Sequence, residues 1–259
     1  MTHSNDFCAE VLRNIESAAK DRDLLGLSNI WIRQIIPYNY AHNFSWLGRP
    51  ILQVPQDIYV MQEIVWKVKP DMIIETGIAH GGSVIMSASM LALSDYCEAV
   101  DHETALYPRK SRRRVLGVDI EIRPHNREAI EAHPMAHLIE MIEGSSVAPD
   151  VIDKVKTAAK AHKKVLLFLD SSHTHDHVLA ELRAYAPLVS VGSYCVVWDT
   201  GIEDLPENFC SDRPWGKGNN PKTAVYEYLK STDCFEIDKL INHKLMITAA
   251  PDGFLRRVK

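Results

Sequence analysis

The sequence predicts an α/β fold built on a doubly wound, mostly parallel sheet. From about residue 56 onward, short apolar runs alternate with segments of helical periodicity, which is the order of a parallel sheet covered by helices. Four of the apolar runs are continuous, as expected for strands buried on both faces. The chain has 259 residues, of which 46 % are hydrophobic, so we expect one large globular domain.

The first 55 residues are predicted to form a small helical arm or lid ahead of the main domain, which spans residues 56–259. Phe7 to about Lys20 has helical spacing of its apolar residues. A segment rich in aromatic residues and turn formers follows, from Ile35 to Pro50. Because a single domain of this size would not bury these aromatics, we expect a homo-oligomer.

The main domain is expected to alternate helices and strands and to end in a hairpin. The predicted strands are Met72–Thr76, Val115–Asp119, Ala136–Ile142, Val165–Asp170 and Tyr194–Asp199. The predicted helices are Gln56–Val68, Ser83–Leu93, Asn126–His133, Val147–Lys160 and His175–Tyr185. At the end of the chain, Phe235–Asn242 followed by Lys244–Ala250 is predicted to form an antiparallel hairpin at the sheet edge.

Composition and charge exclude several functions. A net charge of -5 gives no overall attraction to nucleic acid, and the basic run Arg109–Arg114 indicates a solvated loop or, alternatively, an anion site. No apolar run is long enough to cross a membrane, and the first residues lack a signal-peptide pattern, so a cytoplasmic location is expected. Five scattered cysteines without a C-x-x-C pair indicate neither a zinc site nor a disulfide framework.

The glycine-rich turn from Glu75 to Ser83 is the first candidate site. In a doubly wound sheet, ligands bind at the carboxyl ends of the strands. Here an acid begins the pattern E-x-G-x-x-x-G-G, which is closer to S-adenosylmethionine binding than to the G-x-G-x-x-G of dinucleotide folds. Gly77 lets the backbone approach a ligand, His80 lies within the turn, and the helix at Ser83 offers free N–H groups. A tight turn without a ligand is the alternative.

Two further strand ends carry polar residues. Asp119 closes an apolar run, where an acid commonly accepts hydrogen bonds from ribose hydroxyls. Ser145 directly follows another strand and suits the lining of an adenine pocket, although a helix N-cap by Ser145 or Ser146 is an equal alternative.

The most informative strand end is Asp170 with His173. A carboxylate there suits a hard divalent cation, and an imidazole suits proton removal near neutral pH. Asp199, at the end of the next strand, is predicted to complete a metal site with Asp170. The alternative is that either aspartate caps a helix. His175 and His177 are predicted to be surface residues of the helix that follows.

Several motifs together resemble the cephalosporin hydroxylase family from about Phe44 to the C-terminus. They are Glu75-Thr-Gly-Ile-Ala-His-Gly-Gly-Ser, Gly144-Ser-Ser, Leu169-Asp-Ser-Ser-His-Thr, Arg213-Pro-Trp-Gly-Lys-Gly-Asn-Asn-Pro-Lys-Thr-Ala and Ala250-Pro-Asp-Gly-Phe-Leu-Arg-Arg. The resemblance implies a Rossmann-like, class I methyltransferase fold. It also implies an S-adenosylmethionine-dependent O-methyltransferase that acts on a hydroxyl of a small molecule, as in cephamycin-pathway, macrolide-sugar and rhamnosyl enzymes.

The resemblance also implies roles for single residues. The methionine part of the cofactor falls to Glu75, Gly77 and Ser83, the ribose to Asp119 and the adenine side to Ser145. Asp170 lines the cofactor pocket and, with Asp199, matches the magnesium ligands, whereas His173 matches the general base.

One position departs from the pattern of this family. The family has an acid immediately before the aspartate matched by Asp199, whereas this sequence has Trp198. The loss of one carboxylate weakens a magnesium site, so metal dependence is open. Glu203 or Asp204 is an alternative donor from the following loop.

Two rival functions belong to other classes. A non-heme iron oxygenase would need two histidines and a carboxylate, for which Asp170, His173 and His175 are candidates. A non-catalytic cofactor-binding protein would fit the replacement at Trp198.

Overall fold

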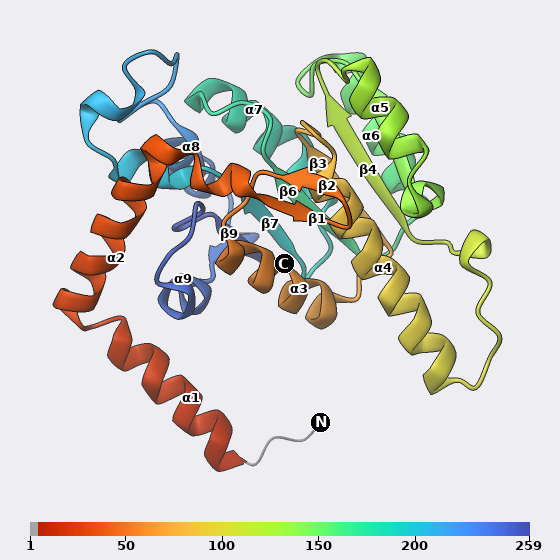
Figure 1. Ribbon diagram of the computed structural model, residues 1–259, viewed down its shortest axis with the longest axis horizontal. Helices are drawn as coiled ribbons and strands as arrows, with labels where there is room; N and C mark the ends of the chain where they lie inside the picture. Colours follow the sequence, from red (N-terminus) through yellow and green to blue (C-terminus); the bar gives the residue numbers. More distant parts are fainter. Residues whose placement is uncertain (1–4) are drawn as a thin grey trace.

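A seven-stranded, doubly wound sheet forms the centre of the molecule (Figure 1). The computed structural model describes residues 5–259. Residues 1–4, on which the signal-peptide prediction depends in part, lie outside the described residues. The strand order is β5-β4-β3-β6-β7-β9-β8, and β3 to β7 are parallel. These five strands are β3 (Met72–Thr76), β4 (Arg114–Asp119), β5 (Ile139–Glu143), β6 (Val165–Leu169) and β7 (Tyr194–Val197). The predicted fold class is confirmed.

Helices cover both faces of the sheet because its central strands are apolar on both sides. All residues of β3 and β6 are buried. One apolar cluster packs between the sheet and α3, α4 and α5, which are Pro55–Val68, Gly82–Asp101 and Pro124–Glu131. The other packs against α6, α7 and α8, which are Pro149–Ala159, His175–Tyr185 and Pro221–Lys230. The helix α3 ends before Pro70, as the sequence predicts.

The N-terminal segment contains one helix more than the sequence analysis expects. The predicted first helix is α1 (Asn5–Ala18), and α2 (Arg22–Ile35) follows it after a short turn. Asp21 caps α2 by accepting hydrogen bonds from the backbone N–H groups of Asp23 and Leu24, both at 3.0 Å. Both helices lie at the edge of the molecule, where α1 contacts α9 (Figure 1).

A small hairpin connects this segment to the main sheet. It consists of β1 (Phe44–Trp46) and β2 (Arg49–Ile51), and it packs on α4. The indole N–H of Trp46 donates to the Ser89 hydroxyl at 2.9 Å. The carbonyl of Pro50 lies so close to Gly82 that a Cβ atom there would collide with it. The aromatic segment therefore packs in part against the main domain.

The predicted C-terminal hairpin is placed wrongly, although an antiparallel pair does close the sheet. Its first strand, β8 (Phe235–Ile237), is short and is followed by the helix α9 (Lys239–Leu245). The second strand is β9 (Phe254–Arg257), which pairs antiparallel with both β7 and β8. The buried residues Phe254 and Leu255 fill the edge of the core, whereas the predicted strand after Lys244 is a loop. Pairing with a distant strand decided this placement.

Two other expectations need correction. The strand expected from Ala136 begins at Ile139, because Pro134–Leu138 forms a 3-10 helix. The basic run is not solvated throughout: Arg113 is buried and forms ion pairs with Asp95 at 2.9 Å and with Glu98. Arg113 joins α4 to the start of β4 and so has a structural role. In the described part of the chain, no helix combines the length and apolar character needed to cross a membrane.

Candidate active site

The predicted site residues lie at the point where the sheet reverses its winding. The chain leaves β3 in one direction along the sheet and returns through β6 on the other side. At this junction Gly77 (φ +92°) follows β3, and a Cβ atom there would collide with the carbonyl of Asp170 after β6. Glycine is therefore required to bring the two strand ends together. Such a junction is the usual ligand site of doubly wound sheets.

Glu75 is buried beneath the glycine-rich turn. Its carboxylate is bonded by the hydroxyls of Ser87 and Ser83, both on α4. Burial raises its pKa from 4.5 to about 7, and the two serines only partly offset this effect. The first turn of α4 has no side-chain cap, so its N–H groups are available to a ligand. Glu75 and Ser83 thus meet at one end of the turn.

The carboxylate of Asp119 binds the backbone of the glycine-rich turn. Its Oδ2 accepts hydrogen bonds from the backbone N–H groups of Ile78 at 2.7 Å and Ala79 at 3.1 Å. The carbonyl of His80 accepts from Arg49 at 3.0 and 2.6 Å, which ties the turn to the N-terminal hairpin. The sequence analysis missed Arg49, because its partner lies 31 residues further along the chain.

Asp170, His173 and Asp199 come together at the ends of β6 and β7. Each offers a ligand atom, and these atoms all lie within 4.8 Å of one another. His173 Nε2 lies 3.2 Å from Asp199 Oδ2. The edge of the His173 ring meets Trp215, with ring centroids 4.7 Å apart. The predicted juxtaposition of the two aspartates and the histidine is therefore present.

Negative charge surrounds Asp170. Burial raises its pKa well above the usual value, and the nearby carboxylates of Asp199, Glu75, Glu181 and Asp57 raise it further. Neither Asp170 nor Asp199 has an ion pair with a lysine or arginine among the described residues. Carboxylate oxygens without a balancing cation are the donor set that a hard divalent ion prefers, so the residues fit magnesium.

The replacement at Trp198 is accommodated by the core. Trp198 is 3 % exposed and packs against Phe168 and Phe254, away from the two aspartates. Neither alternative donor takes the place of the missing acid. Glu203 accepts from Gly218 N at 2.8 Å and Asn220 Nδ2 at 2.5 Å, and Asp204 pairs with Lys222 at 2.6 Å. Glu203 thereby fixes the loop that carries Trp215.

The remaining histidines and serines form separate contacts. The ring of His175 turns to Thr223, at 2.8 Å, and to Glu227, at 3.3 Å. It is therefore not part of a set with Asp170 and His173. His177 bonds the hydroxyls of Ser146 and Ser171, so the view of both histidines as simple surface residues is wrong. Ser145 lies half-buried in the loop after β5.

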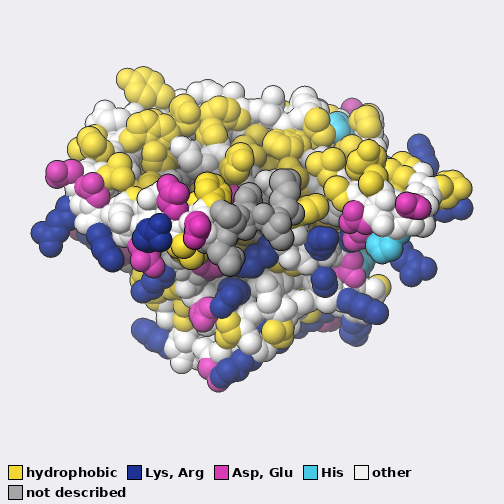
Figure 2. All heavy atoms as spheres, turned by 90° about the horizontal axis from the view of Figure 1, so that it is seen from below, with side chains coloured by type: hydrophobic (Ala, Val, Ile, Leu, Met, Phe, Trp, Pro, Cys, Tyr) yellow, Lys and Arg dark blue, Asp and Glu magenta, His cyan; other side chains and the backbone are white. Residues whose placement is uncertain are grey.

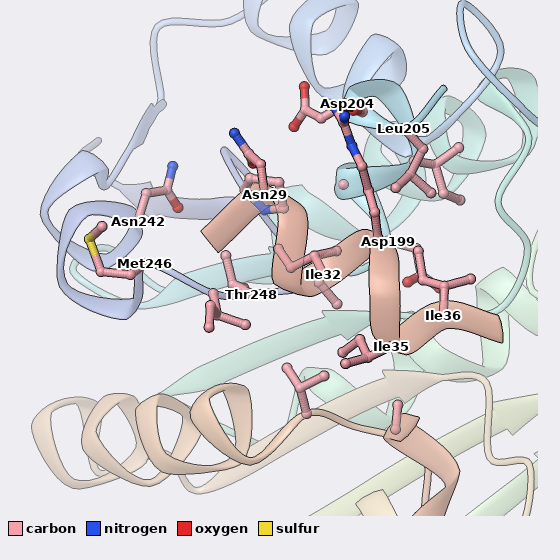
Figure 3. Close-up of a pocket in the computed structure, with 18 of the residues that line it drawn as sticks. Asn29, Ile32, Ile35, Ile36, Asp199, Asp204, Leu205, Asn242, Met246 and Thr248 are labelled. Atoms are coloured by element: carbon pink, nitrogen blue, oxygen red, sulfur yellow. Dashed lines mark hydrogen bonds between the residues drawn. The ribbon is translucent and has the colours of Figure 1, made fainter. Parts of the chain in front are cut away.

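A cavity of about 590 Å³ lies between α2 and the C-terminal segment. Figure 3 shows Ile32 and Ile35 of α2 on one side, with Met246 and Thr248 on the other. Asp199 lines the same cavity, which places one carboxylate of the cluster at its wall. The sequence analysis missed this cavity because its walls come from opposite ends of the chain.

The doubly wound sheet, the acid-glycine turn at its switch point and the acids at the next strand ends define a class I methyltransferase. Residues 38–258 match the family model described as Rhamnosyl O-methyltransferase/CmcI, and the chain belongs to this family. It is an S-adenosylmethionine-dependent O-methyltransferase, as predicted.

Individual relatives agree with this assignment. The rhamnosyl O-methyltransferase of Mycobacterium leprae is 28 % identical over 221 residues, which cover 85 % of this chain and 86 % of the relative. The corresponding protein of Mycobacterium bovis is 27 % identical over 228 residues, 84 % of this chain and 82 % of the relative.

Solved structures share the fold. One of CmcI with SAH superposes with a TM-score of 0.54 at 19 % identity and 83 % coverage of both chains. An apo structure of CalS11, described as a TDP-rhamnose 3'-O-methyltransferase, superposes with a TM-score of 0.51 at 14 % identity, covering 99 % of this chain and 96 % of that one.

Proposed function

We propose that the protein methylates a hydroxyl group on a small acceptor, a sugar or sugar-bearing natural product, with His173 as the general base. The single observation that carries this proposal is the meeting of Asp170, His173 and Asp199 beside a cavity. The rhamnosyl O-methyltransferases among the relatives support a sugar hydroxyl as the acceptor.

The glycine-rich side of the site is proposed to hold the cofactor. When bound, S-adenosylmethionine supplies a sulfonium methyl group that an oxygen nucleophile can displace. Glu75, Gly77, His80 and Ser83 would enclose its amino-acid end, since they combine a buried carboxyl group with the uncapped start of α4. Asp119 is proposed for the ribose and Ser145 for the adenine side, while Asp170 lies where the cofactor and the cation meet.

The other side of the site is proposed to bind and activate the acceptor. Asp170 and Asp199 would hold a magnesium ion, which supplies a positive charge for the reacting oxygen. Asp199 holds the ring of His173 by its Nε2 contact, and Trp215 limits rotation of the ring from another side. His173 is thereby fixed to take the hydroxyl proton.

The cavity between α2 and the C-terminal segment suits an acceptor with an apolar body. Many of its lining side chains are apolar, among them Ile32, Ile35, Ile202 and Met246. Asp199 is the group that links this cavity to the reacting centre. An apolar aglycone in the cavity would leave a sugar hydroxyl near Asp199 and His173.

Replacing His173 with alanine tests the role of the base. We expect turnover to fall by about 10²- to 10⁴-fold while the affinity for S-adenosylhomocysteine stays unchanged. The measurements are methyl transfer to a panel of rhamnosyl and other deoxysugar glycosides, and calorimetry with S-adenosylhomocysteine. His177→Ala is the matched control. Unchanged turnover in His173→Ala would remove this residue as the base.

Two outcomes would favour the rival functions. Tightly bound iron with 2-oxoglutarate-dependent oxidation would support an oxygenase, although His175 lies apart from the other two candidate ligands. Cofactor binding without transfer to any acceptor would support a non-catalytic role. The proposal also includes a homo-oligomer in the cytoplasm and no nucleic-acid or membrane partner.

A further inference from the structure

We infer that Gln53 is a ligand of the cation site and replaces, by its amide oxygen, the carboxylate that Trp198 removes. This inference rests on the cation site of the proposed function. Gln53 lies between β2 and α3, far in sequence from Asp170 and Asp199, and no local motif marks it.

Gln53 is fixed inside the protein next to Asp170. Its side chain is buried, with 5 % of the residue exposed, and its neighbours Ile51 and Val54 belong to the core. The amide Nε2 donates to Asp170 Oδ2 at 3.4 Å.

The amide oxygen of Gln53 has no partner. Oε1 is fully buried and forms no hydrogen bond among the described residues. Most buried polar atoms in folded proteins have a hydrogen-bond partner, and leaving one unpaired destabilises the folded state. A cation held by Asp170 would favour the flipped amide, in which Oε1 instead of Nε2 faces the site and gains a partner.

The chemistry of the donor set agrees. The site has two carboxylates, those of Asp170 and Asp199. Trp198, which stands where the family has a third acid, packs in the core and contributes no ligand. Magnesium prefers oxygen ligands and usually binds to one or two carboxylates with other oxygens. An amide oxygen is such a ligand and adds no further negative charge to the surroundings of Asp170, where Glu75, Glu181 and Asp57 already contribute.

The test is calorimetric titration of the cofactor-free protein with magnesium alone. Gln53→Met keeps the volume of the side chain and removes both polar groups, and we expect it to weaken magnesium binding by about 10- to 100-fold. Gln53→Glu restores an oxygen ligand and should bind magnesium at least as tightly as the wild type. Gln56→Ala is the matched control, because Gln56 also has an unpaired buried oxygen but no hydrogen bond to either aspartate.

The glutamate variant separates a ligand from a merely structural amide. If Gln53 served only to donate to Asp170, then Gln53→Glu would lose the donor, repel Asp170 and bind magnesium worst of all. That order, or wild-type affinity in Gln53→Met, would overturn the inference. Absence of magnesium binding in the wild type would overturn it too. S-adenosylhomocysteine titrations of the same samples report separately on the proposed function, and circular dichroism shows whether each variant is folded.

Discussion

The buried carboxyl group of Glu75 is a residue at which stability and the proposed cofactor binding would be linked. The group lies in the fully buried strand β3 and bonds two serine hydroxyls of α4. Its pKa of about 7 means that ionisation opposes folding, so the protein keeps a carboxylate here at a cost in stability. Such a cost is typical of a group retained for function, and a cationic amino group of a bound cofactor would offset it.

Replacing Glu75 with glutamine should remove a pH-dependent loss of stability. Below about pH 4.5 Glu75 is protonated in both states and has no effect. As the pH rises to about 7, the unfolded chain ionises first, so the free energy of unfolding falls. We therefore expect the wild type to lose roughly 2 to 3 kcal/mol relative to Glu75→Gln between pH 5 and pH 8.

Urea unfolding at the two pH values measures this difference. Asp57, whose pKa is also raised to about 7 by burial, is present in both proteins and so cancels in the comparison. A difference between wild type and Glu75→Gln that does not change with pH would show that Glu75 is not protonated at neutral pH in the folded protein.

At the scale of elements, the start of α4 contacts both the glycine-rich turn and the N-terminal hairpin. Its first-turn N–H groups have no side-chain cap, and Gly82 in the same turn touches the carbonyl of Pro50 in β2. The hairpin leads directly into the segment that carries Gln53. The position of α4 therefore affects the glycine-rich turn and the proposed cation site together.

Gly82→Ala should separate the hairpin from α4. The added methyl group would collide with the backbone of Pro50 and Ile51, which cannot yield as a flexible side chain can. We expect a loss of about 1–3 kcal/mol in the free energy of unfolding. Gly26→Ala, inside α2 and with no atom near the added Cβ, should instead stabilise the protein by about 0.5–1 kcal/mol. Denaturant unfolding measures both, and equal effects would contradict this account.

At the scale of the whole molecule, exposed apolar residues gather on the N-terminal helices and on α3 and α4. They include Phe7, Leu12, Leu24, Leu27, Ile30, Tyr59, Trp66, Leu93, Tyr96 and Val100. Figure 2 shows hydrophobic side chains over one half of the face seen there, with lysine and arginine concentrated in the other half. Apolar surface of this extent is characteristic of proteins that associate.

We expect the arm to contribute to self-association. Leu27 and Ile30 of α2 are 63 % and 56 % exposed, and replacing both with glutamate would place charge in the contact. Sedimentation velocity should show an oligomer for the wild type and a smaller species for the double variant. Val191→Glu, at an exposed apolar residue in a turn away from the arm, should leave the oligomer intact. A monomeric wild type would contradict the expectation.

Local sequence determined most of the fold and half of the site. Continuous apolar runs and helical periodicity depend on burial of near neighbours, so they located four of the five parallel strands and α7 closely. Parallel strands end at one edge of the sheet, and this rule predicts from the sequence that Asp170, His173 and Asp199 lie together. The acid-glycine turn could be recognised from its local pattern, whereas the carbonyl of Asp170, which requires glycine at position 77, lies far along the chain.

Only the tertiary structure decided what depends on distant partners. The strand β9 was fixed by pairing with β7 and β8, and the side chain of Trp198 by its packing on Phe254. Gln53 reaches Asp170 across 117 residues, and the cavity joins α2 to the C-terminal segment. Periodicity carries no information about such contacts, because they arise only when whole elements pack against one another.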